Sequence, residues 1–135
     1  MRKVFADAYY WVALLNPQDQ GHLAAQAIGN TLQGVPLVTT DEILTEVLAY
    51  FSERGRHPRQ VAVQFVENIL SDPEIEVRPQ TRQTFLAALS LFKSRPDKGY
   101  SLTDCVSMLA MREEGITEIL MRDAHFRQEG YIVLL

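Results

Sequence analysis

Four carboxylates stand in apolar surroundings, in segments spread over almost the whole chain. They are Asp7 in VFADAYYW, Glu46 in EILTEVLAYF, Asp104 in YSLTDCVSMLAM and Asp123 in EILMRDAHF. Burying an unpaired carboxylate costs several kcal/mol, so each residue needs either a helix-capping role of its own or a cation that the four residues share. A shared site would be lined by oxygen, the ligand type that Mg²⁺ and Mn²⁺ prefer.

The capping role is a real alternative for three of these residues. Asp7 and Asp123 directly follow predicted strands, where an aspartate accepts hydrogen bonds from the first N–H groups of the next helix. The spacing Ser101-x-x-Asp104 before an apolar run is close to a capping box. Neither role prevents the second carboxylate oxygen from facing a cation.

Glu46 has no capping position, and its helix position is more informative. One apolar stripe with helical spacing contains Ile43, Leu44, Val47, Leu48 and Phe51. Glu42 falls nearly opposite this stripe, where we expect a solvated charge. Glu46 falls at its margin, which leaves both a half-buried site and a solvated position open.

Taken together, the four acids favour a metal site. Like charges in one site raise each other's pKa, so four carboxylates approach closely when a cation lies between them. The histidines, His22, His57 and His125, lie far apart, and none has the i, i+4 partner of a helical zinc site. A hard divalent cation lowers the pKa of a bound water and offsets charge on a phosphoryl group, as in metal-dependent nucleases and phosphatases.

Composition and net charge limit the classes of protein to which the chain can belong. The chain has 135 residues, of which 47% are hydrophobic, and this favours one domain over residues 1–135 with one core. Its 13 basic and 17 acidic residues give a net charge of −4, which argues against broad phosphate neutralisation. A single cysteine, Cys105, excludes an internal disulfide. Asp7 interrupts the apolar N-terminal stretch and no run is long enough for a membrane span, so we expect a soluble cytoplasmic protein without a membrane partner.

The predicted elements alternate between strands and helices. Strands are expected at residues 3–6, 36–40, 75–79, 116–121 and 131–135, and helices at 8–16, 22–33, 42–55, 58–71, 81–94 and 101–115. Alternation of this kind indicates an α/β fold with a parallel sheet covered on both faces. Ligands of such sheets bind at the carboxyl ends of the strands, where Asp7 and Asp123 fall.

The motifs VFADAYYWVALL, VTTDEILTEV, DKGYSLTDCVSML and MRDAHF, in this order, resemble the PIN domain and in particular the VapC-type ribonuclease toxins. The resemblance spans residues 2–135. It implies a three-layer fold with a four- or five-stranded parallel sheet between helices. It also implies an acidic pocket that binds one or two Mg²⁺ or Mn²⁺ ions and hydrolyses RNA phosphodiester bonds, in the toxin of a toxin–antitoxin pair.

By the same resemblance, the pocket residues are Asp7, Glu46, Asp104 and Asp123. Asp7 and Asp104 would bind metal directly, and Glu46 and Asp123 would complete the pocket by ligation or by holding metal-bound waters. The neighbouring polar residues Ser101, Thr103 and Asp97 are candidates for supporting these acids, although Ser101 equally fits a cap and Asp97 an ordinary turn. The family commonly has Thr or Ser two residues before its last acid, where this chain has Met121, and a small or hydroxyl residue soon after its first acid, where this chain has Ala8 and Tyr9.

Two further groups are candidates for RNA contact. Arg54, Arg56 and Arg59 form the densest basic stretch, and they fit either a phosphate clamp or a solvated turn. The aromatic run Tyr9–Trp11 could stack on a base, but we expect at least two of the three in the core. The resemblance also implies a homodimer and a small antitoxin that blocks the pocket.

Two other functions compete with the nuclease. A PIN-like module that binds RNA or protein without turnover is supported by the Met121 departure. A signalling receiver domain also places acids at the edge of a parallel sheet, but it needs a late lysine at a strand end. The last lysine here is Lys98, ahead of a helix, which disfavours the receiver.

Overall fold

The centre of the computed structural model, which describes residues 1–122 and 125–135, is a five-stranded parallel sheet. Its strand order is β3-β2-β1-β4-β5. The strands are β1 (Val4–Ala6), β2 (Leu37–Thr40), β3 (Ile75–Arg78), β4 (Glu118–Leu120) and β5 (Ile132–Val133), each parallel to its neighbour. The predicted α/β class and the parallel sheet are therefore confirmed.

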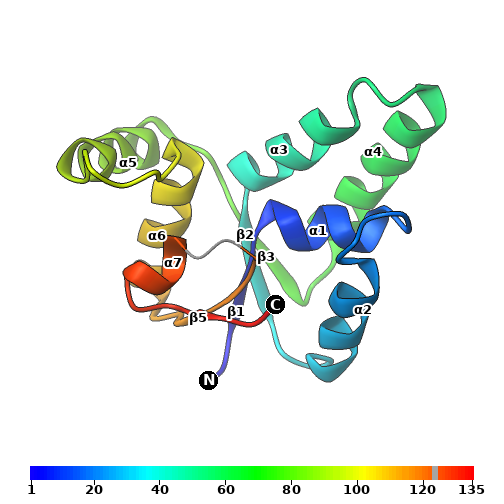
Figure 1. Ribbon diagram of the computed structural model, residues 1–135, viewed down its shortest axis with the longest axis horizontal. Coiled ribbons are helices and arrows are strands. Elements are labelled where there is room, and N and C mark those ends of the chain that lie inside the picture. The colour runs from blue at the N-terminus through cyan, green and yellow to red at the C-terminus, as the bar shows by residue number, and fades with distance from the viewer. Residues whose placement is uncertain (123–124) are drawn as a thin grey trace.

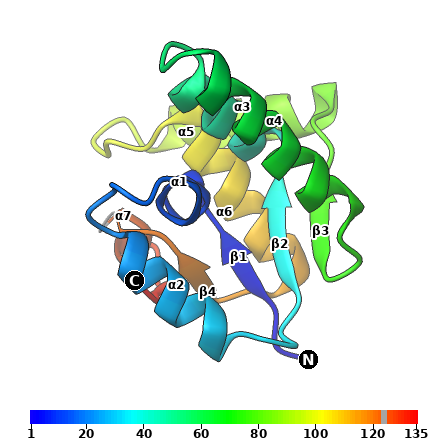
Figure 2. The same cartoon turned by 90° about the vertical axis from the view of Figure 1, so that its right-hand side faces the viewer.

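Helices cover both faces of this sheet. They are α1 (Ala8–Leu15), α2 (His22–Thr31), α3 (Asp41–Phe51), α4 (Arg56–Ser71), α5 (Arg82–Ser94), α6 (Leu102–Glu114) and α7 (His125–Gln128). Figure 1 shows α1 to α4 on one side of the sheet and α5 to α7 on the other. Figure 2 shows α1 and α2 in front of the sheet and α6 behind it.

The observed elements differ from the predicted ones in two places. Helix α4 begins at Arg56, two residues before Pro58, because a proline in the first turn has no N–H to lose from the helix. Helix α7 is a short helix in the segment that was predicted as a plain connection between the last two strands. The strands are otherwise shorter than expected by at most two residues at either end, as is common for strand boundaries.

The end of β1 is fixed by buried polar contacts as well as by packing. All three residues of β1 are fully buried, as expected for a central parallel strand. The Thr39 hydroxyl donates to the Ala6 carbonyl at 2.9 Å and accepts from the Trp11 indole N–H at 3.3 Å. These bonds join β1, β2 and α1 one residue before Asp7. Tyr10 and Trp11 are buried, which confirms the core role for two of the three aromatic residues.

Ion pairs hold the opposite end of α6. The Glu114 carboxylate accepts from the Lys3 ammonium at 3.0 Å and from the Arg78 guanidinium at 2.8 Å. These contacts tie the C-terminal end of α6 to the residue before β1 and to β3.

Among the described helices, none combines the length and the apolar character needed to cross a membrane.

Candidate metal centre

Asp7 lies where β1 ends and α1 begins. Its backbone N–H donates to the Leu120 carbonyl at 3.1 Å, so it also adjoins the end of β4. One carboxylate oxygen, Oδ2, accepts from the Tyr9 backbone N–H at 3.5 Å, and Asp7 is the N-cap of α1. The side chain is half-buried. The capping role is therefore present, in a residue placed at the carboxyl edge of the sheet.

Asp104 lies in the first turn of α6. The Ser101 hydroxyl accepts from the Asp104 backbone N–H at 3.0 Å, and Asp104 Oδ2 accepts from the Ser101 N–H at 3.0 Å, which completes a capping box. The Asp104 side chain is 19% exposed, and its Oδ2 lies 4.0 Å from Nδ1 of His125. Both the capping box and an enclosed position, each expected from the sequence, are thus observed for this residue.

Glu46 reaches the same region from α3. Its carboxylate accepts a hydrogen bond from the Thr103 side chain, which precedes Asp104 on α6. Although Glu46 as a whole is exposed, its carboxyl group lies close enough to α6 to lose part of its hydration. Thr103 therefore joins the two helices that carry Glu46 and Asp104.

The three acids act on one another electrostatically. Burial raises the pKa of Asp7 to about 7, and the nearby charges of Asp104 and Glu46 add to this effect. Burial also raises the pKa of Glu46, as does Asp104, while the hydrogen bond from Thr103 works in the opposite direction. A cation placed among these groups would favour their ionised forms.

The carboxylates of Asp7 and Asp104 fit a hard divalent cation that is bound by few protein side chains. Within residues 1–122 and 125–135, no three His, Cys, Asp or Glu side chains lie close enough together to hold one ion between them. Mg²⁺ is commonly bound by one or two carboxylates, with waters and substrate phosphates completing its octahedron. Asp7 and Asp104 offer carboxylates of this kind, and Glu46 lies close enough to affect the charge of Asp7.

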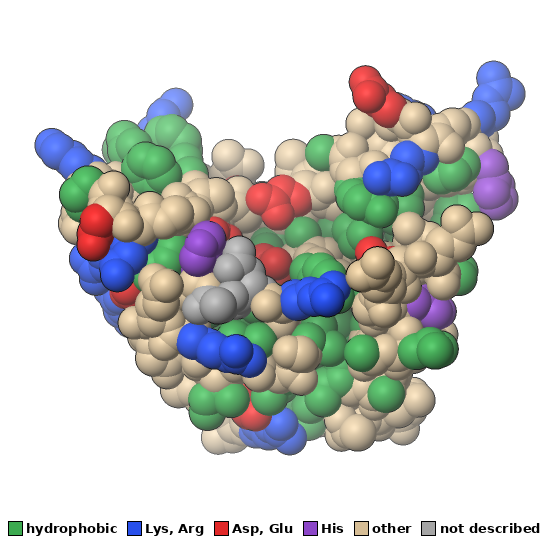
Figure 3. Space-filling view, in the orientation of Figure 1, with side chains coloured by type: hydrophobic (Ala, Val, Ile, Leu, Met, Phe, Trp, Pro, Cys, Tyr) green, Lys and Arg blue, Asp and Glu red, His purple; other side chains and the backbone are tan. Residues whose placement is uncertain are grey.

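The surface around these residues is hollowed. Figure 3 shows acidic side chains in the hollow between two lobes, with Lys or Arg side chains near its front rim. Asp123, the fourth predicted acid, lies outside the described residues. Met121, two residues before it, is buried in the core, so an apolar side chain fills the position where the family resemblance implies a hydroxyl.

The supporting residues predicted from the sequence divide into two groups. Thr103 contacts Glu46 and Ser101 caps α6 beside Asp104, so both lie at this edge. Asp97 is exposed in the turn before α6, with its carboxylate 4.0 Å from the Lys98 ammonium, which fits the turn interpretation.

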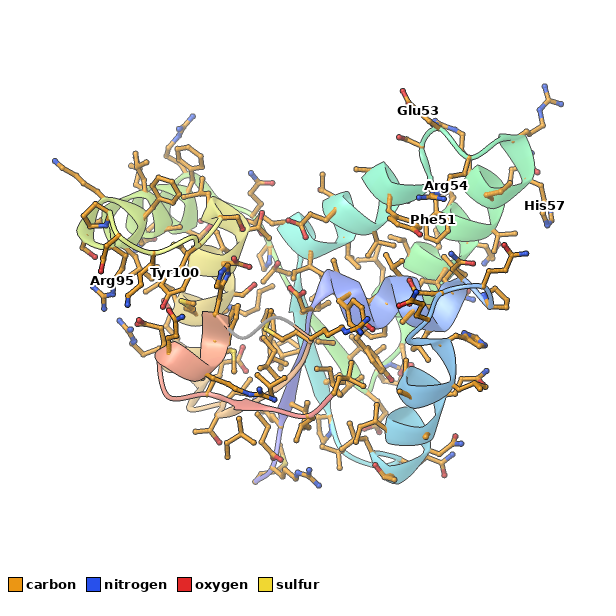
Figure 4. The ribbon with its side chains drawn as sticks, in the orientation of Figure 1. Phe51, Glu53, Arg54, His57, Arg95 and Tyr100 are labelled. Carbon is orange, nitrogen blue, oxygen red and sulfur yellow. The ribbon has the colours of Figure 1, made fainter. Side chains whose placement is uncertain are left out.

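The predicted arginine cluster lies at the far end of the lobe formed by α3 and α4. Figure 4 places Arg54 and His57 at this tip. The Arg54 guanidinium donates to the Tyr50 carbonyl at 2.9 Å and lies 3.9 Å from the Tyr50 ring centroid. Arg59 donates to the Ser52 carbonyl at 2.8 Å. Arg54 and Arg59 therefore stabilise the turn between two helices, while Arg56 is exposed.

Two residues near the acids were not singled out from the sequence. His125 contacts Asp104, and its ring packs edge-on against Tyr100 with centroids 5.6 Å apart. Arg122 donates to the Tyr9 hydroxyl at 3.4 Å. The sequence feature that could have indicated both residues is their position within two residues of Asp123.

Comparison with known proteins agrees with this architecture. No family model matches the chain. It is 24% identical over 129 residues to the 23S rRNA-specific endonuclease VapC20 of Mycobacterium tuberculosis, covering 96% of this chain and 95% of the relative, in both strains CDC 1551 and H37Rv.

Solved structures show the same fold. The crystal structure of M. tuberculosis VapC20, a sarcin–ricin loop cleaving toxin, matches with a TM-score of 0.84 and 22% identity over 97% of this chain and 98% of that one. FitAcB from Neisseria gonorrhoeae matches with a TM-score of 0.64 and 13% identity over 98% and 96% of the two chains. The sequence similarity to VapC20 extends along nearly the whole of both chains and the fold is shared with its crystal structure, which supports the resemblance to VapC-type PIN domains.

Proposed function

We propose that this chain is a Mg²⁺- or Mn²⁺-dependent endoribonuclease and the toxin of a type II toxin–antitoxin pair. The observation that carries the proposal is that Asp104 and Glu46, from two distant helices, lie near enough to Asp7 at the end of β1 to raise its pKa. Residues 1–135 would form one PIN domain that acts in the cytoplasm.

Each acid has a proposed role in hydrolysis. Asp7 and Asp104 would hold the cation. When bound, the cation supplies a water of lowered pKa and offsets charge on the phosphoryl group. Glu46, oriented by Thr103, would accept a proton from the attacking water, a role that suits a carboxyl of raised pKa. Asp123 would complete the pocket as a further ligand or by holding a water.

The substrate class comes from the relative. VapC20 is named as an endonuclease specific for 23S rRNA and as a toxin that cleaves the sarcin–ricin loop. We propose a structured RNA as substrate for this chain, with the sarcin–ricin loop as the first candidate. An antitoxin and a second copy of the chain are the proposed protein partners.

An assay with a labelled hairpin of the sarcin–ricin loop tests this function. The purified protein is incubated with the hairpin in Mg²⁺, in Mn²⁺ or in chelator, and products are separated on a denaturing gel. We expect one internal cut in either metal and none in chelator. Cleavage that persists in chelator, or stepwise shortening from an end, would contradict the metal-dependent endonuclease.

A second function, RNA binding without turnover, has one observation in its favour. Met121 is buried where the family resemblance implies a hydroxyl that could orient a water. Under this alternative the hairpin would bind the protein and remain intact in Mg²⁺ and in Mn²⁺, and total ribosomal RNA would remain intact as well.

A further inference from the structure

An acidic pocket that cleaves RNA must also hold a polyanion. The chain carries a net charge of −4, and its acids at the edge of the sheet repel phosphates. Most protein contacts that position a nucleic acid are hydrogen bonds from basic and polar groups to phosphate oxygens. The pocket therefore needs a cationic side chain close by.

The arginine-rich turn between α3 and α4 does not meet this need well. It lies at the tip of its lobe, away from the end of β1, as Figure 4 shows for Arg54 and His57. Arg54 and Arg59 each donate one hydrogen bond to a backbone carbonyl, of Tyr50 and Ser52 respectively, and these bonds hold both guanidinium groups at the tip.

Arg122 is better placed, because it lies two residues beyond Leu120, whose carbonyl at the end of β4 accepts from the Asp7 backbone N–H at 3.1 Å. Its guanidinium donates to the Tyr9 hydroxyl at 3.4 Å and lies 5.9 Å from the centre of the Tyr9 ring. The Tyr9 backbone N–H in turn donates to Asp7 at 3.5 Å. Arg122 is exposed, and a guanidinium has five N–H donors, of which the described residues engage one.

The position of Tyr9 is itself fixed by the fold. A Cβ atom at Gly21 would lie 2.1 Å from the Tyr9 hydroxyl oxygen, so glycine at this position leaves the space that the hydroxyl occupies. Gly21 is held in turn by Asp19, whose carboxylate accepts from its N–H at 2.8 Å. The turn before α2 thus sets the place of the tyrosine that contacts Arg122.

We propose that Arg122, which lies two residues beyond the end of β4 and is held by Tyr9, binds a phosphate of the RNA backbone at the rim of the acidic pocket. A planar guanidinium can donate two parallel hydrogen bonds to one phosphate, and a preorganised one loses less entropy on binding. The inference rests on the proposed function for the identity of the ligand, and it concerns binding of RNA separately from its cleavage.

Binding in an inactive background tests this role. The probe is the labelled sarcin–ricin hairpin, and all variants carry Asp104→Asn, so that cleavage does not interfere. Arg122→Gln should raise the Kd about tenfold and reduce the slope of log Kd against log salt concentration by about one phosphate contact. Arg122→Lys keeps the charge and should retain the salt slope, while Tyr9→Phe should raise the Kd about threefold by removing the anchoring hydroxyl.

Arg112→Gln is the matched control, because it removes the same charge from an exposed position in the last turn of α6, at the end of that helix opposite Asp104. It should change the Kd by less than about twofold, and thermal melting should show that every variant is folded. Unchanged affinity and salt slope for Arg122→Gln, or equal effects of Arg122→Gln and Arg112→Gln, would overturn the inference and leave cleavage by the wild type unaffected. Binding that depends on Arg122 in a protein that cleaves no RNA would instead refute the nuclease and retain the phosphate contact.

Discussion

Asp7 is the N-cap of α1 and is also a proposed ligand of the cation. As the N-cap of α1 it accepts a backbone hydrogen bond, which favours its ionised form. Burial and the charges of Asp104 and Glu46 outweigh this effect and raise its pKa to about 7. The residue is thus held in place by its cap while its charge is unfavourable without a cation.

The raised pKa of Asp7 predicts how stability depends on pH. Because the folded pKa lies above the unfolded value of 3.8, the folded state binds the extra proton between about pH 4 and pH 7. The metal-free protein should therefore lose stability as pH rises through this window. Asp7→Asn keeps a capping oxygen and removes the charge, so its Tm in chelator should exceed that of the wild type by on the order of 5 °C at pH 8, and by little at pH 4.

Added Mg²⁺ should affect the Tm of the wild type and of Asp7→Asn differently. The cation should raise the Tm of the wild type at pH 8 and leave that of Asp7→Asn nearly unchanged, because it binds the folded state through the Asp7 carboxylate. Glu53→Gln, at an exposed loop position, is the control and should follow the wild type. A wild-type Tm that rises from pH 4 to pH 8 in chelator, relative to Asp7→Asn, would contradict the account of Asp7.

At the scale of elements, the first turn of α6 brings the acids together. Ser101 and Asp104 cap the helix reciprocally, and Thr103 reaches from the same turn to Glu46 on α3. The C-terminal end of α6 is held by the ion pairs of Glu114 with Lys3 and Arg78. The helix is therefore fixed at both ends, with its N-terminus at the acidic edge.

Ser101→Ala separates the capping role from a direct role in the pocket. The hydroxyl accepts from the Asp104 N–H, and its loss should lower the free energy of unfolding by about 1 kcal/mol. We expect the cleavage rate per folded molecule to stay within about twofold of the wild type. Urea unfolding and single-turnover cleavage below the unfolding transition check both values. A loss of rate without a loss of stability would assign Ser101 to the pocket itself.

Thr103→Val tests the bridge between α3 and α6. The hydrogen bond from Thr103 lowers the pKa of Glu46, so its removal should raise that pKa further and leave Glu46 less ionised in mild acid. Cleavage should fall about tenfold at pH 6 and less at pH 8, while Thr103→Ser should retain the wild-type profile. The pH profile of kcat/KM for the three proteins provides the measurement. Equal loss for the Ser and Val variants would show that the hydroxyl has no role.

The elements themselves could be read from the sequence to a large extent. Hydrophobic periodicity and turn residues predicted the alternating strands and helices, and the junction at Asp7 followed from a short β-prone segment before a helical one. The same pattern placed Asp7 at the carboxyl edge of the sheet. Helix α7 was missed because four residues are too few to show a helical period.

Contacts between distant elements could not be predicted in the same way. The hydrogen bond from Thr103 to Glu46 depends on how α3 and α6 approach each other, and the contact of Arg122 with Tyr9 joins residues 113 positions apart. Neither pair has a local signature, since each depends on tertiary packing. The family resemblance supplied the set of four acids, and the structure describes three of them.

At the scale of the whole molecule, two lobes rise above the acidic edge of the sheet, one containing α3 and α4 and the other α5 (Figures 1 and 3). One face of α5 exposes large apolar side chains at helical spacing. Leu86 is 52% exposed, Leu89 45% and Phe92 47%. Such a stripe is typical of a surface that another chain covers.

The predicted homodimer can be tested on this stripe. Leu89→Glu places a charge between Leu86 and Phe92 and should convert a dimer to a monomer, because burying an unpaired carboxylate is costly. Ser90→Glu adds the same charge at the next exposed position and should leave the dimer intact. Sedimentation velocity of the two variants and the wild type gives the result. A wild type that is monomeric at high micromolar concentration, or a dimeric Leu89→Glu protein, would contradict this interface.

The proposed metal-dependent centre of Asp7 and Asp104 can be tested by the single-turnover cleavage rate of the sarcin–ricin hairpin, measured as a function of Mn²⁺ concentration. The wild-type rate should rise to saturation with Mn²⁺ and vanish in chelator. Asp7→Asn and Asp104→Asn should each lower the saturated rate by at least about a hundredfold in folded protein, because each removes a ligand of the cation. Full activity in both variants, or a wild-type rate independent of Mn²⁺, would contradict the proposal.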